Sequence, residues 1–178
     1  LAGALTFVLY GLLIRAYPVA FMNALIVGID VYYLLQMWRQ REYFTFLEVA
    51  PDDRYLGHFL AFHAEEIQRF QPGFTYAPDD NLMVFFVLRN MIPAGLFIAR
   101  RRPDAPETAV VLLDFVIPGY RDLRIGRYVY QENARYFQTR GIQRLVSSPG
   151  TTDHSQYLEK MGYTPQAGNC YSLSLSSL

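Results

Sequence analysis

The sequence has little lysine, cysteine or histidine. Its 178 residues include one lysine (Lys160), one cysteine (Cys170) and three histidines. A single cysteine excludes an internal disulfide framework and fits a reducing compartment. The histidines are scattered without the spacing of metal ligands, so no metal site is predicted. The 16 basic and 16 acidic residues cancel, which argues against the basic surface that nucleic-acid binding requires.

Apolar residues make up 52% of the chain and are concentrated in its first third. Residues 1–14 carry no charged side chain, and Pro18–Trp38 is an apolar run of 21 residues. Because about 20 residues of helix cross the hydrocarbon core of a bilayer, the second run is long enough to span a membrane. The first run is too short as it stands. Since the chain starts at Leu1 rather than at methionine, we expect the first span to be cut.

Residues 1–38 are therefore predicted to form a transmembrane hairpin of two antiparallel helices, with a tight connection at 15–18. Tyr32, Tyr33 and Trp38 occupy the position of an interfacial aromatic belt, and Arg39 and Arg41 follow. By the positive-inside rule, the rest of the chain lies on the cytoplasmic side of a bacterial-type inner (plasma) membrane. A pair of buried helices in a soluble bundle is the alternative.

Asn23 and Asp30 lie seven residues apart and so share one helix face. A charged side chain in lipid is costly, so this face should pack on another helix or line a cavity. Residues 1–38 also resemble the three-helix units of SWEET-like sugar transporters, in Leu9-Tyr10-Gly11-Leu12-Leu13, Tyr17-Pro18-Val19, Asn23 and Tyr32-Tyr33-Leu34. That resemblance implies one further helix upstream and a small transporter subunit with a soluble appendage. An anchor or oligomerisation module, and hence a possible homo-oligomer, is the favoured interpretation.

A linker at residues 39–43 leads to a second domain at 44–178, where short apolar runs alternate with polar turns. Helices are predicted over 53–71, after an arginine-rich turn at 118–126, and up to 163. Strands are predicted at 44–49, 82–88, 93–99, 109–117, 145–147 and 172–175. The order β-α-β-β-β-α-β-α-β predicts an α/β (α+β) fold, a mixed sheet with helices on both faces.

The strand Val110–Ile117, the arginine-rich turn and the following helix form the most informative segment. Such a turn offers backbone N–H groups and the helix dipole to an anion, in particular a phosphate. Three motifs in this part of the chain resemble those of the GNAT superfamily of acyl-CoA-dependent N-acetyltransferases. They are Val116-Ile117-Pro118-Gly119-Tyr120-Arg121 (V-x-P-x-Y-R), Arg121-x-x-Arg124-x-Gly126 (the pyrophosphate loop) and Glu159-Lys160-Met161-Gly162-Tyr163 (E-K-x-G-F).

This resemblance covers roughly residues 44–178 and implies a GNAT-like fold that binds acetyl-CoA or a related acyl-CoA. In that family the backbone of the fourth strand holds the thioester, which corresponds here to Phe115, Val116 and Ile117. The side chain of Arg121 would help to bind the pyrophosphate. The N–H groups that would bind it are those of Leu123, Arg124, Ile125, Gly126 and Arg127.

Asp114 is the one charged residue in its apolar strand, and burial would raise its pKa and make it a candidate general base. An aspartate at a bulge or beside an arginine is the alternative. Tyr157 is a candidate acid for the leaving thiolate, with core packing as the alternative. Two residues depart from the family pattern. Arg124 replaces the first glycine of the loop, and Leu158 aligns with the family's frequent general-acid tyrosine.

The predicted function is a membrane-anchored N-acyltransferase that transfers an acetyl group from acetyl-CoA to an amine. The amine would belong to a small molecule or to a membrane-associated acceptor, and the bilayer would be contacted through residues 1–38. A catalytically degenerate module that binds acyl-CoA, or that serves as an interaction module, is the alternative that Arg124 and Leu158 motivate.

Overall fold

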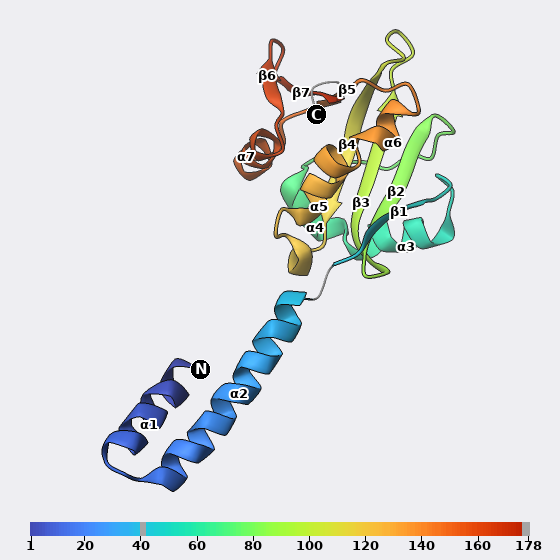
Figure 1. The fold of residues 1–178 in the computed structure, drawn as a ribbon. Coiled ribbons are helices and arrows are strands. Elements are labelled where there is room, and N and C mark those ends of the chain that lie inside the picture. Colours follow the sequence, from blue (N-terminus) through green and yellow to red (C-terminus); the bar gives the residue numbers. More distant parts are fainter. Residues whose placement is uncertain (40–41, 176–178) are drawn as a thin grey trace. The chain divides into compact units, whose positions relative to one another are not determined.

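The chain folds into a helical hairpin, Leu1–Glu42, and an α/β unit, Tyr43–Leu178, in the computed structural model (Figure 1). The structure describes residues 1–39 and 42–175. Arg41 therefore lies outside the described residues, together with residue 40 of the predicted linker at 39–43. Each unit is described by itself below.

The hairpin consists of α1 (Ala2–Leu13) and α2 (Tyr17–Arg39), joined by a turn in which Arg15 has a φ of 60°. Gly11 allows the two helices to pack closely at Ala20, since a Cβ on Gly11 would lie 2.8 Å from the Ala20 nitrogen. Asn23 and Asp30 are both half-buried, and the Asn23 amide donates to the Val19 carbonyl.

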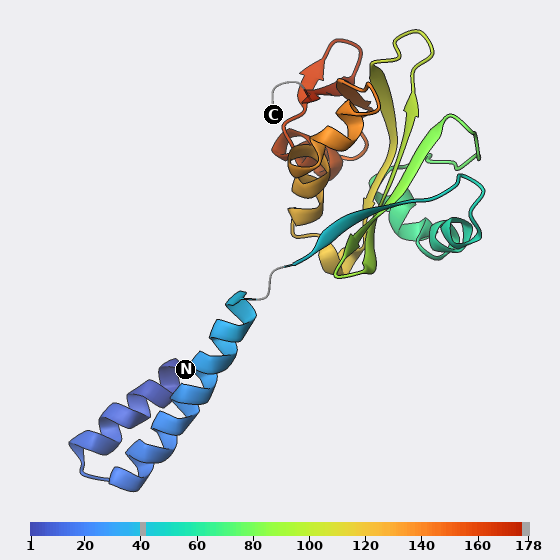
Figure 2. The ribbon, with the colours of Figure 1, turned by 45° about the vertical axis from the view of Figure 1, so that its right-hand side comes forward.

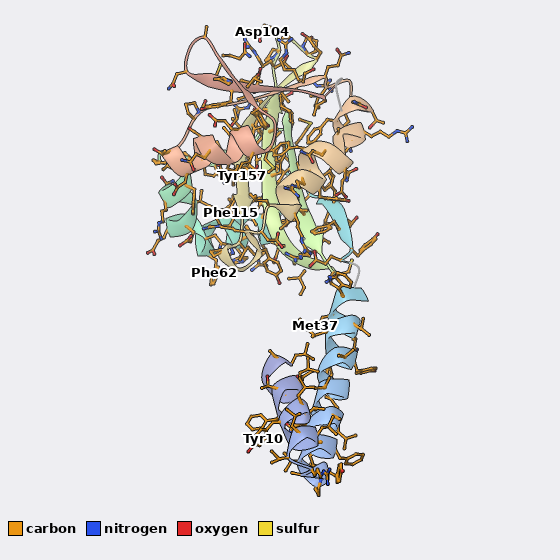
Figure 3. The ribbon with its side chains drawn as sticks, turned by 60° about the vertical axis from the view of Figure 1, so that its left-hand side comes forward. Tyr10, Met37, Phe62, Asp104, Phe115 and Tyr157 are labelled. Atoms are coloured by element: carbon orange, nitrogen blue, oxygen red, sulfur yellow. The ribbon has the colours of Figure 1, made fainter. Side chains whose placement is uncertain are left out.

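Large apolar side chains cover the outside of the hairpin. Tyr10 on α1 and Met37 on α2 are examples, with exposed fractions of 52% and 69% (Figure 3). Tyr17–Trp38 is the one helix in the described part of the chain that is long and apolar enough to cross a membrane. The structure thus shows one candidate span in a helical hairpin, whereas the sequence predicted a hairpin that spans twice.

A seven-stranded mixed sheet forms the centre of the α/β unit, in the order β1-β2-β3-β4-β5-β7-β6. Within it, β4 and β5 are parallel and the other neighbouring strands are antiparallel. The strands are β1 (Phe44–Glu48), β2 (Leu82–Arg89), β3 (Ile92–Arg101), β4 (Thr108–Val116), β5 (Arg144–Ser147), β6 (Thr164–Gln166) and β7 (Cys170–Ser174). The short strand β6 was not predicted.

Helices cover both faces of this sheet, as the sequence predicted (Figures 1 and 2). On one face lie α3 (Arg54–Phe62) and α4 (Ala64–Phe70). The Asp53 carboxylate caps α3 by accepting from the Tyr55 and Leu56 amides. The single helix predicted over 53–71 is wrong, because the helix breaks at His63.

The opposite face carries a segmented helix and α7 (Thr152–Lys160). The segmented helix follows a 3₁₀ turn, Pro118–Tyr120, where the sequence predicted one long helix. Its parts are α5 (Arg124–Arg127), a π-helical turn (Tyr128–Glu132) and α6 (Ala134–Gln138). A π-helical turn interrupts the regular i→i−4 ladder, and the hydrogen-bond pattern that produces it is not visible in apolar spacing.

A β-bulge at Leu112 decides which face of the sheet Asp114 occupies. Across β3, Ile98 pairs with Leu113 whereas Ala99 pairs with Val111, so Leu112 is the extra residue. Side chains alternate along a strand, and the bulge reverses that alternation. Val111 therefore packs in the core beneath α5–α7, Leu113 packs in the core beneath α3 and α4, and Asp114 is brought to the α7 side.

Candidate functional site

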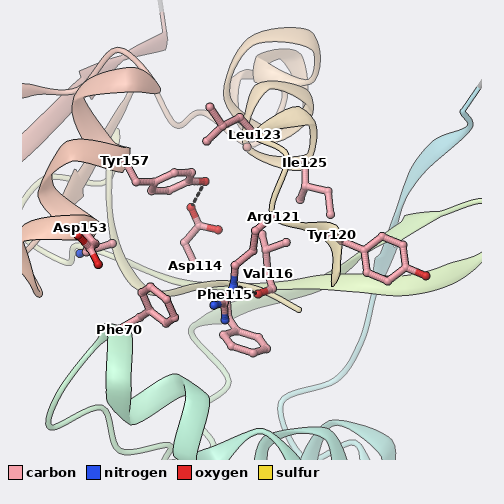
Figure 4. A pocket seen from close by; sticks show the side chains of 12 residues that line it. Phe70, Asp114, Phe115, Val116, Tyr120, Arg121, Leu123, Ile125, Asp153 and Tyr157 are labelled. Carbon is pink, nitrogen blue, oxygen red and sulfur yellow. Dashed lines mark hydrogen bonds between the residues drawn. The ribbon is translucent and has the colours of Figure 1, made fainter. Parts of the chain in front are cut away.

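A cavity opens where β4 and β5 part. The two strands are paired as far as Val111 and Ser147, and β4 then continues to Val116 with β3 on one side and no strand on the other. The cavity has a volume of about 180 Å³ and lies between the end of β4, the arginine-rich turn, α5, α7 and the end of α4 (Figure 4). We call it the β4–α7 cavity. Its lining residues are Phe70, Asp114, Phe115, Val116, Tyr120, Arg121, Leu123, Ile125, Gly126, Asp153, His154 and Tyr157.

Two phenols hold the Asp114 carboxylate at the wall of this cavity. Its Oδ2 accepts hydrogen bonds from the hydroxyl groups of Tyr130, at 2.6 Å, and Tyr157, at 2.8 Å. Burial raises the pKa of Asp114, and the two hydrogen bonds oppose that shift because they stabilise the charged form. The pKa of Tyr157 is raised well above its ordinary value by burial and by the nearby Asp114 charge.

Tyr157 faces the cavity while its neighbour Leu158 is buried in the core with 1% of its surface exposed. Successive helix residues lie about 100° apart, so only one of the two can point into the cavity. The Tyr157 hydroxyl also lies against Gly126, since a Cβ on that glycine would be 2.5 Å from it. Gly126 thus allows α5 and α7 to approach each other.

The arginine-rich turn contains a carboxylate at the position where the sequence predicted free amides. Leu123 has a φ of 66°, a left-handed conformation that costs a non-glycine residue about 1–2 kcal/mol. The Asp122 Oδ1 accepts from the Arg124 amide at 3.1 Å, and its Oδ2 lies 2.9 Å from the Arg89 guanidinium. The Arg127 amide donates to the Leu123 carbonyl. Of the five amides predicted to bind pyrophosphate, those of Arg124 and Arg127 are therefore already hydrogen-bonded within the chain.

Arg121 is likewise engaged inside the α/β unit. Its Nε donates to the Val116 carbonyl at 2.9 Å, and its guanidinium forms an ion pair with Glu66 of α4 at 3.1 Å. The guanidinium also lies 4.1 Å from the centre of the Phe70 ring. These contacts join α4 to the end of β4. The sequence had instead predicted that the Arg121 side chain would be free to bind phosphate.

Gln71 binds the edge of β4 that β5 leaves exposed. Its side-chain amide donates to the Leu112 carbonyl and accepts from the Asp114 amide, both at 3.3 Å. The Ile117 amide donates to the Ala94 carbonyl. Sequence analysis missed Gln71, because a contact between residues separated by more than 40 positions has no local signature.

His154 is a second site residue that the sequence analysis missed. It lies in the first turns of α7, lines the cavity and is 5% exposed. Its Nδ1 accepts from the Gly150 amide at 3.0 Å. Burial lowers its pKa, and the Asp114 charge opposes that shift. The only sequence signal was a histidine one helical turn before Tyr157.

The structure thus brings most of the predicted site residues to one cavity, where their roles stay predictions. Asp114 and Tyr157 are hydrogen-bonded to each other there. The other predicted residues that line it are Phe115, Val116, Arg121, Leu123, Ile125 and Gly126. Ile117, Arg124 and Arg127 are not among the lining residues.

Comparison with solved structures identifies the fold of the α/β unit as that of GNAT acetyltransferases. An N-acetyltransferase from Staphylococcus aureus aligns with a TM-score of 0.54 at 16% identity, over 75% of this chain and 99% of that one. An aminoglycoside acetyltransferase in complex with coenzyme A and kanamycin aligns with a TM-score of 0.56 at 9% identity, over 74% of this chain and 95% of that one. A tandem GNAT protein from the clavulanic acid biosynthesis pathway aligns with a TM-score of 0.53 at 17% identity, over 70% of this chain and 45% of that one.

Sequence comparison is less informative. No family model matches the chain. An uncharacterized protein of Haemophilus influenzae is 48% identical over 40 residues, which are 22% of this chain and 48% of that protein. The chain thus spans about half the length of this curated relative and of the tandem GNAT protein. The comparisons give no support to the resemblance of residues 1–38 to SWEET-like helices.

Proposed function

We propose that the α/β unit is an N-acyltransferase that transfers an acetyl group from acetyl-CoA to an amine. The observation that carries the proposal is the pair Asp114–Tyr157, hydrogen-bonded at 2.8 Å beside the parting of β4 and β5 in a sheet with the GNAT fold. A carboxylate and a phenol in contact can take a proton from one reacting group and give one to another.

The acyl-thioester end of acetyl-CoA fits the β4–α7 cavity. A cavity of about 150 Å³ accommodates a molecule of the size of benzene, so 180 Å³ has room for an acetyl group and its sulfur. Apolar side chains of Phe70, Leu123 and Ile125 would surround this group. The backbone of Phe115 and Val116, at the end of β4 that β5 does not cover, would hold the thioester.

The pyrophosphate would bind at the start of α5, where the amides of Ile125 and Gly126 lie in the first turn and have no intrahelical acceptor. The Asp122 carboxylate lies in the same turn and opposes an anion there. Phosphate binding would therefore benefit from the Arg89 and Arg124 guanidinium groups, which already lie 2.9 Å and 3.7 Å from Asp122.

The residues of the cavity can move one proton from nitrogen to sulfur. When bound, the thioester supplies the electrophilic carbonyl carbon. Asp114 would take the proton that the amine loses as the carbon–nitrogen bond forms. Both phenol hydrogen bonds go to the Oδ2 atom of Asp114. Its Oδ1 atom, which accepts no hydrogen bond from the residues that the structure describes, would receive the amine proton. Tyr157 would give its hydroxyl proton to the departing sulfur and recover one from Asp114, so that the carbon–sulfur bond breaks without a net change in the charge of the enzyme.

The raised pKa values of this pair suit such a relay. A carboxylate with a raised pKa is a stronger base. The pKa of Tyr157 is too high for it to lose a proton alone, so its proton leaves only as the Asp114 proton moves in. The acceptor would be a small primary amine or an amine on a membrane-associated molecule, presented beside the Asp114 and Asp153 carboxylates.

The test is thiol release from acetyl-CoA by the full chain in detergent, with a panel of primary amines. We expect Asp114→Asn and Tyr157→Phe each to lower kcat by about 10²–10⁴-fold, the usual contribution of general acid–base catalysis. Asp104→Asn, at the exposed β3–β4 turn, is the matched control and should leave kcat unchanged. Equal activity in all four proteins would refute these roles.

A catalytically degenerate acyl-CoA-binding module is the second candidate. It is favoured by the three groups that occupy the binding surface, since Gln71 and Arg121 bind the edge of β4 and Asp122 binds the Arg124 amide. This candidate predicts calorimetric binding of acetyl-CoA with no thiol release for any amine. A folded protein that binds neither acetyl-CoA nor CoA would exclude both candidates.

We further propose that α2 anchors the protein in a bacterial inner membrane with the α/β unit in the cytoplasm. Support comes from the length of Tyr17–Trp38, its mean hydropathy of 1.6, and the apolar surface on the outside of the hairpin. The full chain should remain in the membrane pellet after carbonate extraction, and a variant without residues 1–42 should not. Release of the full chain by carbonate would refute the anchor.

A further inference from the structure

His154 carries a buried hydrogen-bond donor that the proposed proton relay does not use. The side chain is 5% exposed and belongs to the lining of the β4–α7 cavity. Hydrogen bonds fix both its backbone and its ring. The His154 backbone amide donates to the Thr151 hydroxyl, and the Gly150 amide donates to Nδ1 of the ring at 3.0 Å. The ring also lies nearly parallel to that of Tyr157, at an interplanar angle of 20° and a centroid distance of 6.4 Å.

The contact with Gly150 determines which nitrogen of the ring carries the proton. A backbone N–H can only donate, so Nδ1 presents its lone pair to Gly150. Burial lowers the pKa of His154 and favours the neutral ring. A neutral imidazole that accepts at Nδ1 carries its proton on Nε2.

That Nε2–H has no acceptor among the residues that the structure describes. An unpaired buried donor costs about 1–3 kcal/mol, and buried polar groups in proteins are nearly always hydrogen-bonded. Asp114 lies close enough to influence the His154 pKa, yet its hydrogen bonds are with Tyr130 and Tyr157. The Nε2 atom is itself buried, so an acceptor atom of a molecule in the cavity would satisfy the Nε2–H once the side chains that cover this atom shift.

The charges around the cavity restrict the chemistry of that acceptor. Asp114 and Asp153 both line the cavity, and two carboxylates disfavour an anionic ligand group beside them. A protonated amine in the cavity is matched by the same carboxylates but has no lone pair, so it cannot accept from the Nε2–H. Within a bound acyl thioester, the neutral carbonyl oxygen is the acceptor that suits this donor.

We propose that the Nε2–H of His154 donates a hydrogen bond to the acyl carbonyl oxygen of a thioester bound in the β4–α7 cavity. The inference rests on the proposed acyltransferase function and adds a donor from α7 to the backbone groups of β4. Such a bond strengthens as negative charge develops on the carbonyl oxygen, so His154 would favour both thioester binding and acyl transfer.

The experiment compares acetyl-CoA with CoA, which lacks the carbonyl, in calorimetric titrations of the full chain in detergent. The variants are His154→Asn, which keeps an acceptor near Nδ1 for Gly150, and His154→Gln, which keeps a donor near Nε2. The preference is the ratio of the affinity for acetyl-CoA to the affinity for CoA. We expect this ratio to fall about tenfold in His154→Asn, which is the effect of losing one hydrogen bond, while the affinity for CoA stays unchanged. His154→Gln should retain most of the preference.

A second measurement does not depend on the variants. The infrared carbonyl stretch of acetyl-CoA labelled with ¹³C at the carbonyl should lie at lower wavenumber when bound to the wild type than when bound to His154→Asn. The proposal would be overturned if the preference for acetyl-CoA over CoA were unchanged in His154→Asn and lost in His154→Gln. That result would assign His154 a structural role at Gly150. A bound carbonyl stretch in the wild type no lower than in an apolar solvent would also overturn it. If the folded wild type binds neither ligand, the proposed function and this inference both fail, whereas equal binding of both ligands removes the inference alone.

Discussion

Replacing Tyr157 by phenylalanine tests the central contact of the site. The substitution removes one of the two hydroxyl groups that donate to the Asp114 Oδ2, at 2.8 Å, and keeps the aromatic ring. A hydrogen bond to a charged group contributes about 1.5–3 kcal/mol, whereas one between neutral groups contributes about 0.5–1.5 kcal/mol. The loss should therefore be larger when Asp114 is ionised, and the pKa of Asp114 should rise further because its charged form loses a partner.

The sign of the pH dependence follows from proton binding. Because burial raises the pKa of Asp114, the folded state binds more protons than the unfolded state between the ordinary aspartate pKa and the folded-state pKa. The free energy of unfolding is thus highest below that window and falls as the pH rises through the folded-state pKa. In Tyr157→Phe the decrease in the free energy of unfolding should extend to higher pH. Above the folded-state pKa of Asp114, the substitution should lower the free energy of unfolding by about 1.5–3 kcal/mol.

Urea unfolding of residues 43–178 between pH 4 and pH 8, followed by circular dichroism, measures this difference. Tyr163→Phe is the matched control, since it removes a buried hydroxyl that has no hydrogen bond to Asp114. Asp114→Asn should abolish the difference in pH dependence between wild type and Tyr157→Phe. An equal cost of Tyr157→Phe at pH 4 and pH 8 would show that the hydroxyl does not interact with a titrating Asp114.

Two further substitutions test the α5 region. Gly126→Ala would place a methyl group 2.5 Å from the Tyr157 hydroxyl, so we expect the free energy of unfolding in urea to fall by about 1–3 kcal/mol. Gly119→Ala is the control and should be nearly neutral, because a Cβ at that position would meet open space. Asp122→Asn removes the negative charge beside the proposed pyrophosphate site, and acetyl-CoA affinity should rise about threefold at low salt, on the order of a surface charge interaction. Calorimetry at low and high salt checks this, and unchanged or weaker affinity would place the phosphates elsewhere.

The local pattern of apolar residues predicted most of the sheet but not the position of Asp114. Both cores draw alternate residues from β2, with Phe85 and Val87 in one and Val84 and Phe86 in the other, so the sequence showed a continuous apolar run typical of a strand covered on both sides. The bulge that turns Asp114 toward α7 depends on the register with β3 and has no signature in β4 alone.

Long-range side-chain contacts were equally invisible in the sequence. The arginine-rich turn was predicted as a site with free cations, because spacing alone does not show that Glu66 of α4 would lie beside Arg121. Gln71 reaches β4 only because α4 ends next to the unpaired edge of that strand. Contacts of this kind follow from the packing of elements far apart in sequence.

The two departures from the GNAT pattern have different consequences in the structure. Leu158 does not deprive the cavity of a phenol, since Tyr157 supplies a hydroxyl there while Leu158 fills the core. The Arg124 side chain is 59% exposed and lies toward Asp122, so it does not fill the cavity. Neither departure by itself favours a degenerate module. The question of activity therefore depends on whether acetyl-CoA can displace Gln71 and Arg121 from the β4 edge, which exchanges three hydrogen bonds within the protein for new ones to the ligand.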